Sequence, residues 1–164
     1  MQLSAIGYIK NLDLLPHPEG GYYKETYRSA SLFEGTGDFP ASRAWSTAIY
    51  FLLEENNFSA FHKIKSDETW HFYAGNALEV IELDNAGNLK SSVVGPDILN
   101  GQVLQYTVAA GNWFASRVLK GGSFSLVGCT VSPGFDFRDF EMADRNELLK
   151  SFPKHNHIIT ELTR

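Results

Sequence analysis

A chain of 164 residues has the length of one domain, and its 43% hydrophobic and 20% charged residues are typical of a folded core rather than a disordered segment. The formal charge of −5 argues against nucleic-acid or anionic membrane partners, which require clustered lysine and arginine. The single cysteine, Cys129, excludes an intramolecular disulfide, and the first residues lack the apolar stretch of a secretory signal. We therefore expect a cytoplasmic protein that binds a small molecule, with no nucleic-acid and no membrane partner.

The first predicted element is a short helix over residues 4–12, which Ser4 can cap. Strands are predicted next at 22–27 and 45–53, where aromatic and β-branched residues are concentrated. The segment 29–42 between these strands is rich in glycine and serine and is predicted to be irregular.

Seven further β-prone segments follow, separated by turn residues. They lie at 59–61, 68–73, 78–83, 89–94, 103–108, 113–119 and 123–131. No helical pattern separates them, so an all-β sandwich or barrel is predicted over about residues 20–140. Asp144 and Glu147 resemble a capping box that opens the first of two short C-terminal helices, within about residues 145–162. All these elements belong to one predicted domain, residues 1–164.

Two segments resemble the conserved motifs of the cupin superfamily. His62, Glu68 and Gly75 occupy positions of the first motif, and Gly111 matches the glycine of the second. Together with HPEGGYYKETYRS near the start, STAIYFLL, and GCTVSPGFDFRDFE, they make the chain similar to the small single-domain "cupin type 5" family of unknown function. The resemblance implies a double-stranded β-helix, a jelly-roll-like barrel, usually in a homodimer, with a pocket inside the barrel mouth.

The resemblance also raises the question of a metal. In metal-binding cupins two His and one Glu of the first motif, with one His of the second, hold a divalent ion. Here the second His position is Ile64, and the position in the second motif is Phe114. Catalytic metal sites ordinarily have three protein ligands. Asp67 could substitute only if the turn bent it inward, and His71 only by breaking the alternation of its strand. No cofactor is expected, and a divalent metal is disfavoured.

Side chains alternate along a strand, so Glu68, Trp70 and Phe72 share one face. If Glu68 points into the barrel, His71 faces the opposite surface. His62 and Glu68 are then candidates for an acid–base pair, because a carboxylate raises the proton affinity of an imidazole and burial raises the pKa of a carboxyl. The alternative is a hydrogen-bonded pair with a structural role only.

The walls of the pocket are predicted to be aromatic, as small-molecule sites usually are. The substrate-binding candidates are Tyr50, Trp70, Phe72, Gln105, Phe114 and Phe135, and core packing is the alternative for each. Cys129 lies in an apolar run without a positive neighbour and is not predicted to be a nucleophile. His17 could hydrogen-bond the backbone of its loop or contact a ligand.

Functions of different kinds fit these residues. The first is a metal-independent, isomerase- or epimerase-like enzyme that acts on a sugar or carbonyl-bearing metabolite, with His62 as base and Glu68 orienting it. This function resembles that of the nucleotide-sugar epimerases of the cupin superfamily. The alternatives are a non-catalytic ligand-binding or sensing module and a metal-dependent cupin enzyme. No phosphate-binding glycine-rich loop or nucleotide motif indicates a substrate.

Overall fold

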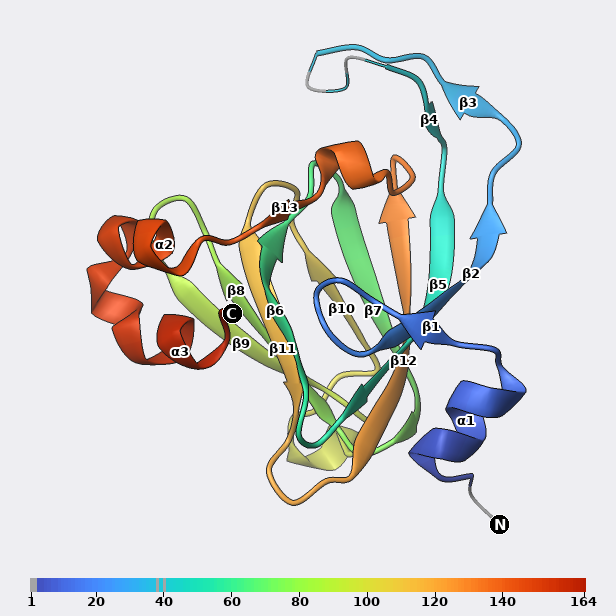
Figure 1. Cartoon of the computed structure of the whole chain (residues 1–164), viewed down its shortest axis with the longest axis vertical. Helices are drawn as coiled ribbons and strands as arrows, with labels where there is room; N and C mark the ends of the chain where they lie inside the picture. Colours follow the sequence, from blue (N-terminus) through green and yellow to red (C-terminus); the bar gives the residue numbers. More distant parts are fainter. Residues whose placement is uncertain (1–2, 38, 40) are drawn as a thin grey trace.

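Two antiparallel β-sheets face each other in the computed structural model, which describes residues 3–37, 39 and 41–164 (Figure 1). In spatial order, the first sheet contains β1 (Leu15–Pro16), β2 (Tyr22–Arg28), β5 (Thr47–Glu54), β12 (Phe124–Ser132), β7 (Asp67–Gly75) and β10 (Gln105–Val108). The second contains β13 (Glu141–Met142), β6 (Phe58–Lys63), β11 (Trp113–Val118), β8 (Leu78–Leu83) and β9 (Leu89–Val94). This mostly β architecture confirms the predicted fold class.

The space between the sheets is filled by one apolar cluster, which contains Phe51, Trp70 and Phe114. Trp70 is fully buried and meets both phenylalanines edge-on, with ring centroids 5.7 Å and 6.4 Å away. The alternation predicted for β7 is confirmed, because Glu68 is buried on the same face as Trp70 whereas Tyr73 is 52% exposed.

Short helices cover the outer faces of the sheets (Figure 1). The helix α1 (Ala5–Asn11) begins as predicted, since Ser4 Oγ accepts a hydrogen bond from the Gly7 N–H, and it covers the first sheet. The helices α2 (Arg145–Ser151) and α3 (Asn156–Glu161) cover the second. Single turns of 3₁₀ helix are η1 (Ile98–Asn100), η2 (Phe137–Asp139) and η3 (Pro153–His155). None of the described helices has the length and apolar character needed to cross a bilayer.

The segment predicted to be irregular contains part of a short β-ladder. β3 (Leu32–Phe33) pairs with β4 (Arg43–Ala44), and the two form an arm that extends beyond the sheets (Figure 1). Trp45 was predicted to begin the next strand, but it lies outside β5, is 55% exposed and packs against Phe33 on the arm. A two-residue strand has no periodicity, so the sequence pattern could not reveal it.

Candidate functional site

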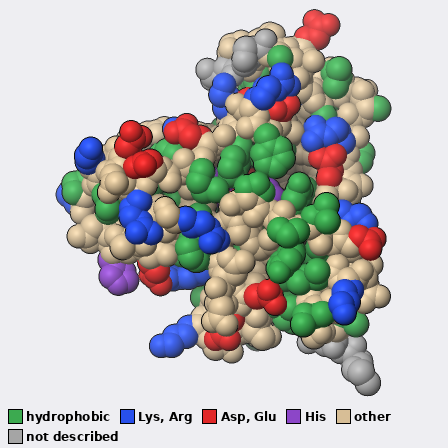
Figure 2. Space-filling model, in the orientation of Figure 1, with side chains coloured by type: hydrophobic (Ala, Val, Ile, Leu, Met, Phe, Trp, Pro, Cys, Tyr) green, Lys and Arg blue, Asp and Glu red, His purple; other side chains and the backbone are tan. Residues whose placement is uncertain are grey.

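A cavity of about 490 Å³ opens at one end of the first sheet. Its lining comes from β2, β5, β6, β7 and β12 and from the loops at 17–21 and 133–137: His17, Glu19, Tyr23, Glu25, Arg28, Thr47, Ile49, His62, Glu68, Cys129, Val131, Phe135, Asp136 and Phe137. In the space-filling view, hydrophobic side chains gather over the middle of the molecule, and charged side chains lie mainly around them (Figure 2). The lining residues of the cavity combine an apolar wall with several ionisable groups, a composition typical of a small-molecule site.

Both predicted catalytic residues line this cavity. His62 comes from β6 in the second sheet and is 1% exposed, and Glu68 comes from β7 in the first sheet and is 8% exposed. They interact electrostatically, but the structure shows no hydrogen bond between these two described residues. Glu68 therefore does not orient His62 as the sequence analysis expected.

The partner of His62 is Glu19 instead. The His62 Nδ1 atom lies 2.7 Å from the Ala60 carbonyl oxygen, and Nε2 lies 3.1 Å from Glu19 Oε2. Because a carbonyl only accepts, Nδ1 carries a proton, and in the neutral ring Nε2 is then an acceptor. Burial raises the pKa of Glu19 and lowers the pKa of His62, so the neutral pair is favoured, with the Glu19 hydroxyl donating to Nε2.

Glu19 reaches the pocket through a tight loop between β1 and β2. The His17 N–H donates to the Gly21 carbonyl, and the Glu19 carbonyl accepts from the Ala60 N–H at 2.9 Å. Gly20 and Gly21 both have positive φ, and a Cβ on Gly20 would lie 2.1 Å from the Phe58 carbonyl oxygen. Only glycine therefore lets this loop pass so close to strand β6 of the same chain and bring Glu19 to His62.

The floor of the cavity consists of His17, Glu19, His62, Glu68 and Cys129, and burial shifts the pKa of each toward its uncharged form. Burial raises the pKa of Glu68 to about 7. His17 Nδ1 lies 3.5 Å from Glu19 Oε2, and burial lowers the pKa of His17. The Cys129 thiol contacts the Glu68 carboxyl, and burial raises the pKa of that thiol, which favours its protonated and weakly nucleophilic form. Glu68 is the group of the floor that can exchange a proton near pH 7.

A β-bulge shapes the mouth of the cavity. Tyr23 and Glu25 share one face of β2 and line the cavity, and the register with β5 shifts between Glu25 and Tyr27. Tyr27 is consequently 55% exposed, and Arg28 rather than Tyr27 lines the cavity.

Of the six predicted substrate-binding residues, the structure places Phe135 in the cavity lining and the other five elsewhere. Trp70, Phe72 and Phe114 pack in the apolar cluster between the sheets, so the alternative of core packing holds for them. Tyr50 follows the lining residue Ile49 on β5 and points to the outer face, where its ring contacts Tyr73.

Gln105 also lies on the outer face of the first sheet. Its side-chain amide is 2.8 Å from His71 Nδ1, and His71 Nε2 is 2.9 Å from Thr130 Oγ1. His71 therefore faces away from the cavity, as the alternation along β7 predicts. Gln105 cannot contact a ligand inside the barrel from this position.

The residues of the cavity do not fit a divalent metal ion. Ile64 and Phe114, at two of the four ligand positions of metal-binding cupins, are 4% and 1% exposed and pack in the apolar cluster. Across the described part of the chain, no three or more His, Cys, Asp or Glu side chains are arranged to hold a metal ion. We therefore derive no chemical step that passes through a metal.

Comparison with known proteins identifies the family. A family model described as "Cupin superfamily (DUF985)" matches residues 7–143. The chain belongs to this cupin family. The family has no assigned function, so membership supports the fold and leaves the reaction open.

Similar cupins have been found in distant organisms. An uncharacterized protein of Saccharomyces cerevisiae is 34% identical over 154 residues, which cover 87% of this chain and 76% of the yeast protein. Solved structures of a hypothetical protein from Leishmania major and a protein from Shewanella oneidensis are 37% and 38% identical, both with a TM-score of 0.91. The matches cover 98% and 99% of this chain, respectively, and 99% of each of the two proteins.

A more distant likeness shows the cupin fold alone. Oxalate decarboxylase from Bacillus subtilis matches with a TM-score of 0.57 and 15% identity, over 90% of this chain and 36% of that enzyme. Its activity is not transferred to this cupin at such low identity.

Sequence reasoning missed several lining residues, of which Glu19 matters most. Glu19 and His17 belong to the HPEGG segment that helped to carry the family resemblance, so the signal was present but was not connected to His62. Tyr23 and Glu25 could have been found by the alternation along β2. The bulge that brings Arg28 to the cavity has no sequence signature that we can identify.

Proposed function

We propose that this cupin is a metal-independent acid–base enzyme, isomerase- or epimerase-like, that moves a proton on a carbon next to the carbonyl of a small metabolite. One observation carries the proposal: two buried carboxyl groups, Glu19 and Glu68, line one cavity beside the His62 imidazole. Carboxyls in an apolar cavity have raised pKa values, which suits general acid and base chemistry near neutral pH.

The geometry supports separate roles for the two carboxyls. Glu68, with a pKa of about 7, is a carboxylate in a large fraction of molecules at neutral pH and can take a proton from carbon. The electron pair of the broken C–H bond moves to the carbonyl oxygen, which then needs a proton. Burial raises the pKa of Glu19 and so favours its protonated form, and His62 positions its carboxyl, so Glu19 can donate that proton. Glu68 then returns a proton to carbon while the Glu19 carboxylate takes a proton back from the enol hydroxyl, which completes an isomerisation and restores both carboxyl groups.

This assignment changes the role of His62. Both ring nitrogens have protein partners, the Ala60 carbonyl and the Glu19 carboxyl, so His62 acts on Glu19 rather than as the base. A carboxylic acid has a single proton, so Glu19 acts as the acid by turning its hydroxyl from His62 Nε2 to the substrate oxygen and turns back once it has regained the proton.

Solvent-deuterium exchange tests the proposal without knowledge of the product. The protein is incubated in D₂O with dihydroxyacetone, D-fructose, D-ribose or 2-oxobutyrate, and deuterium on carbon is measured by mass spectrometry. We expect exchange that increases as pH rises through about 7 and falls by roughly 10²-fold or more in Glu68→Gln. Glu55→Gln, an exposed residue in the loop after β5, is the matched control.

Two outcomes would contradict the proposal. Saturable binding of a probe with no deuterium incorporation would identify a ligand-binding module. Exchange that depends on stoichiometric iron, nickel, manganese or zinc, shown by elemental analysis of protein purified without chelators, would identify a metal-dependent enzyme.

A further inference from the structure

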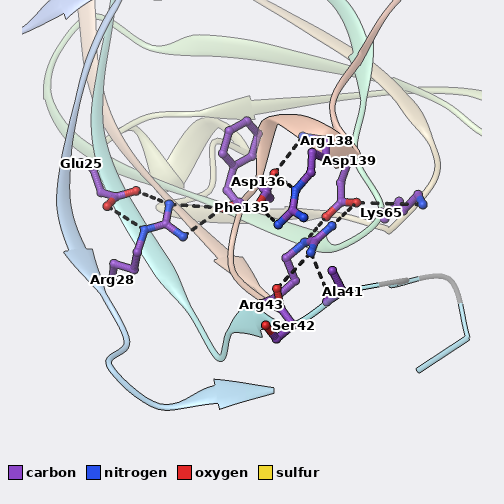
Figure 3. Close-up of polar contacts among 10 residues, drawn as sticks. All are labelled: Glu25, Arg28, Ala41, Ser42, Arg43, Lys65, Phe135, Asp136, Arg138 and Asp139. Carbon is purple, nitrogen blue, oxygen red and sulfur yellow. Dashed lines mark hydrogen bonds and ion pairs between the residues drawn. The ribbon is translucent and has the colours of Figure 1, made fainter. Parts of the chain in front are cut away.

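The mouth of the cavity holds charged groups that are already paired with one another. Arg28 is the only lysine or arginine among the described lining residues. Its Nε and Nη2 atoms donate to the two oxygens of Glu25 at 2.9 Å and 2.6 Å (Figure 3). The Phe135 carbonyl oxygen accepts from both Nη1 and Nη2 at 3.2 Å. Both edges of the Arg28 guanidinium therefore have protein partners.

This pairing leaves little for an anionic ligand to bind. A guanidinium has five N–H donors, and four of those of Arg28 have acceptors in Glu25 and Phe135. The bidentate geometry that recognises a phosphate or carboxylate is occupied by the Glu25 carboxylate. An anion could use Arg28 only by displacing Glu25, which would then be left without its cation.

The second carboxyl of the mouth is paired in the same way. Arg138 donates from Nε and Nη2 to the two oxygens of Asp136 at 2.9 Å and 2.6 Å (Figure 3). The two parallel N–H donors of the Arg138 guanidinium are thus bound by Asp136 rather than by a group in the cavity. The two ion pairs make the mouth close to neutral overall.

The floor also disfavours a negative charge. Glu19 and Glu68 are both buried there, burial favours the neutral forms of His17 and His62, and Arg28 of the lining is paired with Glu25 at the mouth. A phosphate or carboxylate beside Glu68 would repel its ionised form and so remove the base. A hydroxyl, in contrast, can hydrogen-bond either protonation state of Glu68, and a carbonyl can accept a hydrogen bond from the protonated form.

We infer that this cavity takes an uncharged polar ligand, such as a free sugar or another hydroxy-carbonyl compound, and rejects its phosphorylated and carboxylated forms. The inference deepens the proposed function, since it uses the same cavity and names the class of substrate. The Arg28–Glu25 pair is the specificity-determining element, because it removes the one cation of the lining from use by a ligand.

Cys129 permits a direct test, because it lines the cavity and is the only cysteine of the chain. Three methanethiosulfonate reagents of similar size are compared: the uncharged 2-hydroxyethyl, the anionic 2-sulfonatoethyl and the cationic 2-trimethylammonioethyl compounds. In each reaction the thiolate sulfur forms a mixed disulfide with the reagent sulfur, and methanesulfinate leaves. Mass spectrometry gives the rates, which are divided by those for free cysteine. Because all three attack the same thiol, the pKa of Cys129 cancels in their ratio.

We expect the anionic reagent to react roughly tenfold more slowly than the uncharged one after this normalisation. Glu25→Gln should release Arg28 and raise the anionic rate several-fold, and adding Arg28→Ala should remove that gain. Glu55→Gln changes the net charge by the same amount at an exposed site outside the lining and should leave the ratio as in the natural protein. If Cys129 reacts too slowly, the same ratios are measured on Ile49→Cys in a Cys129→Ser background, since Ile49 also lines the cavity.

An anionic reagent that reacts within twofold of the uncharged one would overturn the inference, as would a Glu25→Gln variant with an unchanged ratio. The two proposals fail separately. Discrimination against anions without deuterium exchange would refute the proposed reaction and leave the ligand class intact. Deuterium exchange without discrimination against anions would support the proposed reaction and refute the inferred ligand class.

Discussion

The floor and the mouth of the cavity both contain carboxyl groups, and they differ in what those groups face. At the mouth, Glu25 and Asp136 each face a guanidinium, and the hydrogen bonds from Arg138 lower the pKa of Asp136. On the floor, Glu19 and Glu68 face neutral groups, and burial raises the pKa of both. Ion pairing thus keeps Asp136 charged, whereas burial makes Glu68 able to exchange a proton near neutral pH.

The largest effect that this comparison predicts is the loss of stability on breaking the buried ion pair between Arg43 and Asp139. Arg43 Nε and Nη2 donate to the two oxygens of Asp139 at 2.7 Å and 2.9 Å, and Arg43 is 3% exposed (Figure 3). Arg43→Ala would leave the Asp139 carboxylate buried without its main partner, so we expect the free energy of unfolding to fall by about 3–5 kcal/mol. Urea denaturation measured by circular dichroism gives this value.

Arg138→Ala is the matched control for this prediction. It removes a bidentate pair with the same geometry, but Arg138 lies on the surface, where solvent screens the interaction. We expect a much smaller loss of stability than for Arg43→Ala. Equal losses would mean that burial does not distinguish the two pairs.

The next effect concerns Glu68. Its replacement should stabilise the folded chain relative to the natural protein as pH rises, whereas Arg43→Ala destabilises it. The pKa of Glu68 is about 7 in the folded chain and 4.5 in the absence of the fold, so between these pH values the folded state keeps a proton that the unfolded state has lost. The free energy of unfolding therefore falls as pH rises from 4.5 to 7, by on the order of 3 kcal/mol from this group, and is level above 7. In Glu68→Gln this contribution is absent.

The measurement is a series of urea denaturations of both proteins between pH 4.5 and 8. The difference between the two unfolding free energies should change across this range, because the natural protein loses stability relative to Glu68→Gln as pH rises. The titration of Glu19 is present in both proteins, so the difference reports Glu68 together with its electrostatic coupling to Glu19. A difference that is constant with pH would show that Glu68 has an ordinary pKa and would remove the basis for its role as the base.

The strands could be predicted from the sequence because their signals are local. The β8 strand has the predicted bounds, Leu78–Leu83, and the alternation along β7 correctly placed Glu68 and His71 on opposite faces of the sheet. Each of these predictions uses only the period of two along one strand and the turn residues at its ends. Where the chain obeys such local rules, fold class and the facing of a side chain can be predicted together.

The site was predicted less well because its geometry depends on contacts between distant segments. His62 and Glu68 were found through a short motif, but the link from Glu19 to His62 joins residues 43 positions apart through a glycine-dependent loop. Tyr50 was wrongly predicted to line the cavity. Successive residues of a strand face opposite sides, so Ile49 lines the cavity and Tyr50 lies on the outer face, and the period of two does not reveal which set of residues faces inward.

The smallest predicted effect tests the comparison from outside the cavity. His71 lies on the outer face of the first sheet, where its ring is hydrogen-bonded to Thr130 and Gln105. His71→Ala should change the free energy of unfolding by less than about 1 kcal/mol, because water can replace partly exposed hydrogen bonds. Deuterium exchange and the ratio of thiol reactivities should be unchanged. If His71→Ala removed deuterium exchange as completely as Glu68→Gln, proton transfer would depend on a residue of the outer face of β7. The assignment of the proton-exchanging groups to the cavity floor would then be wrong.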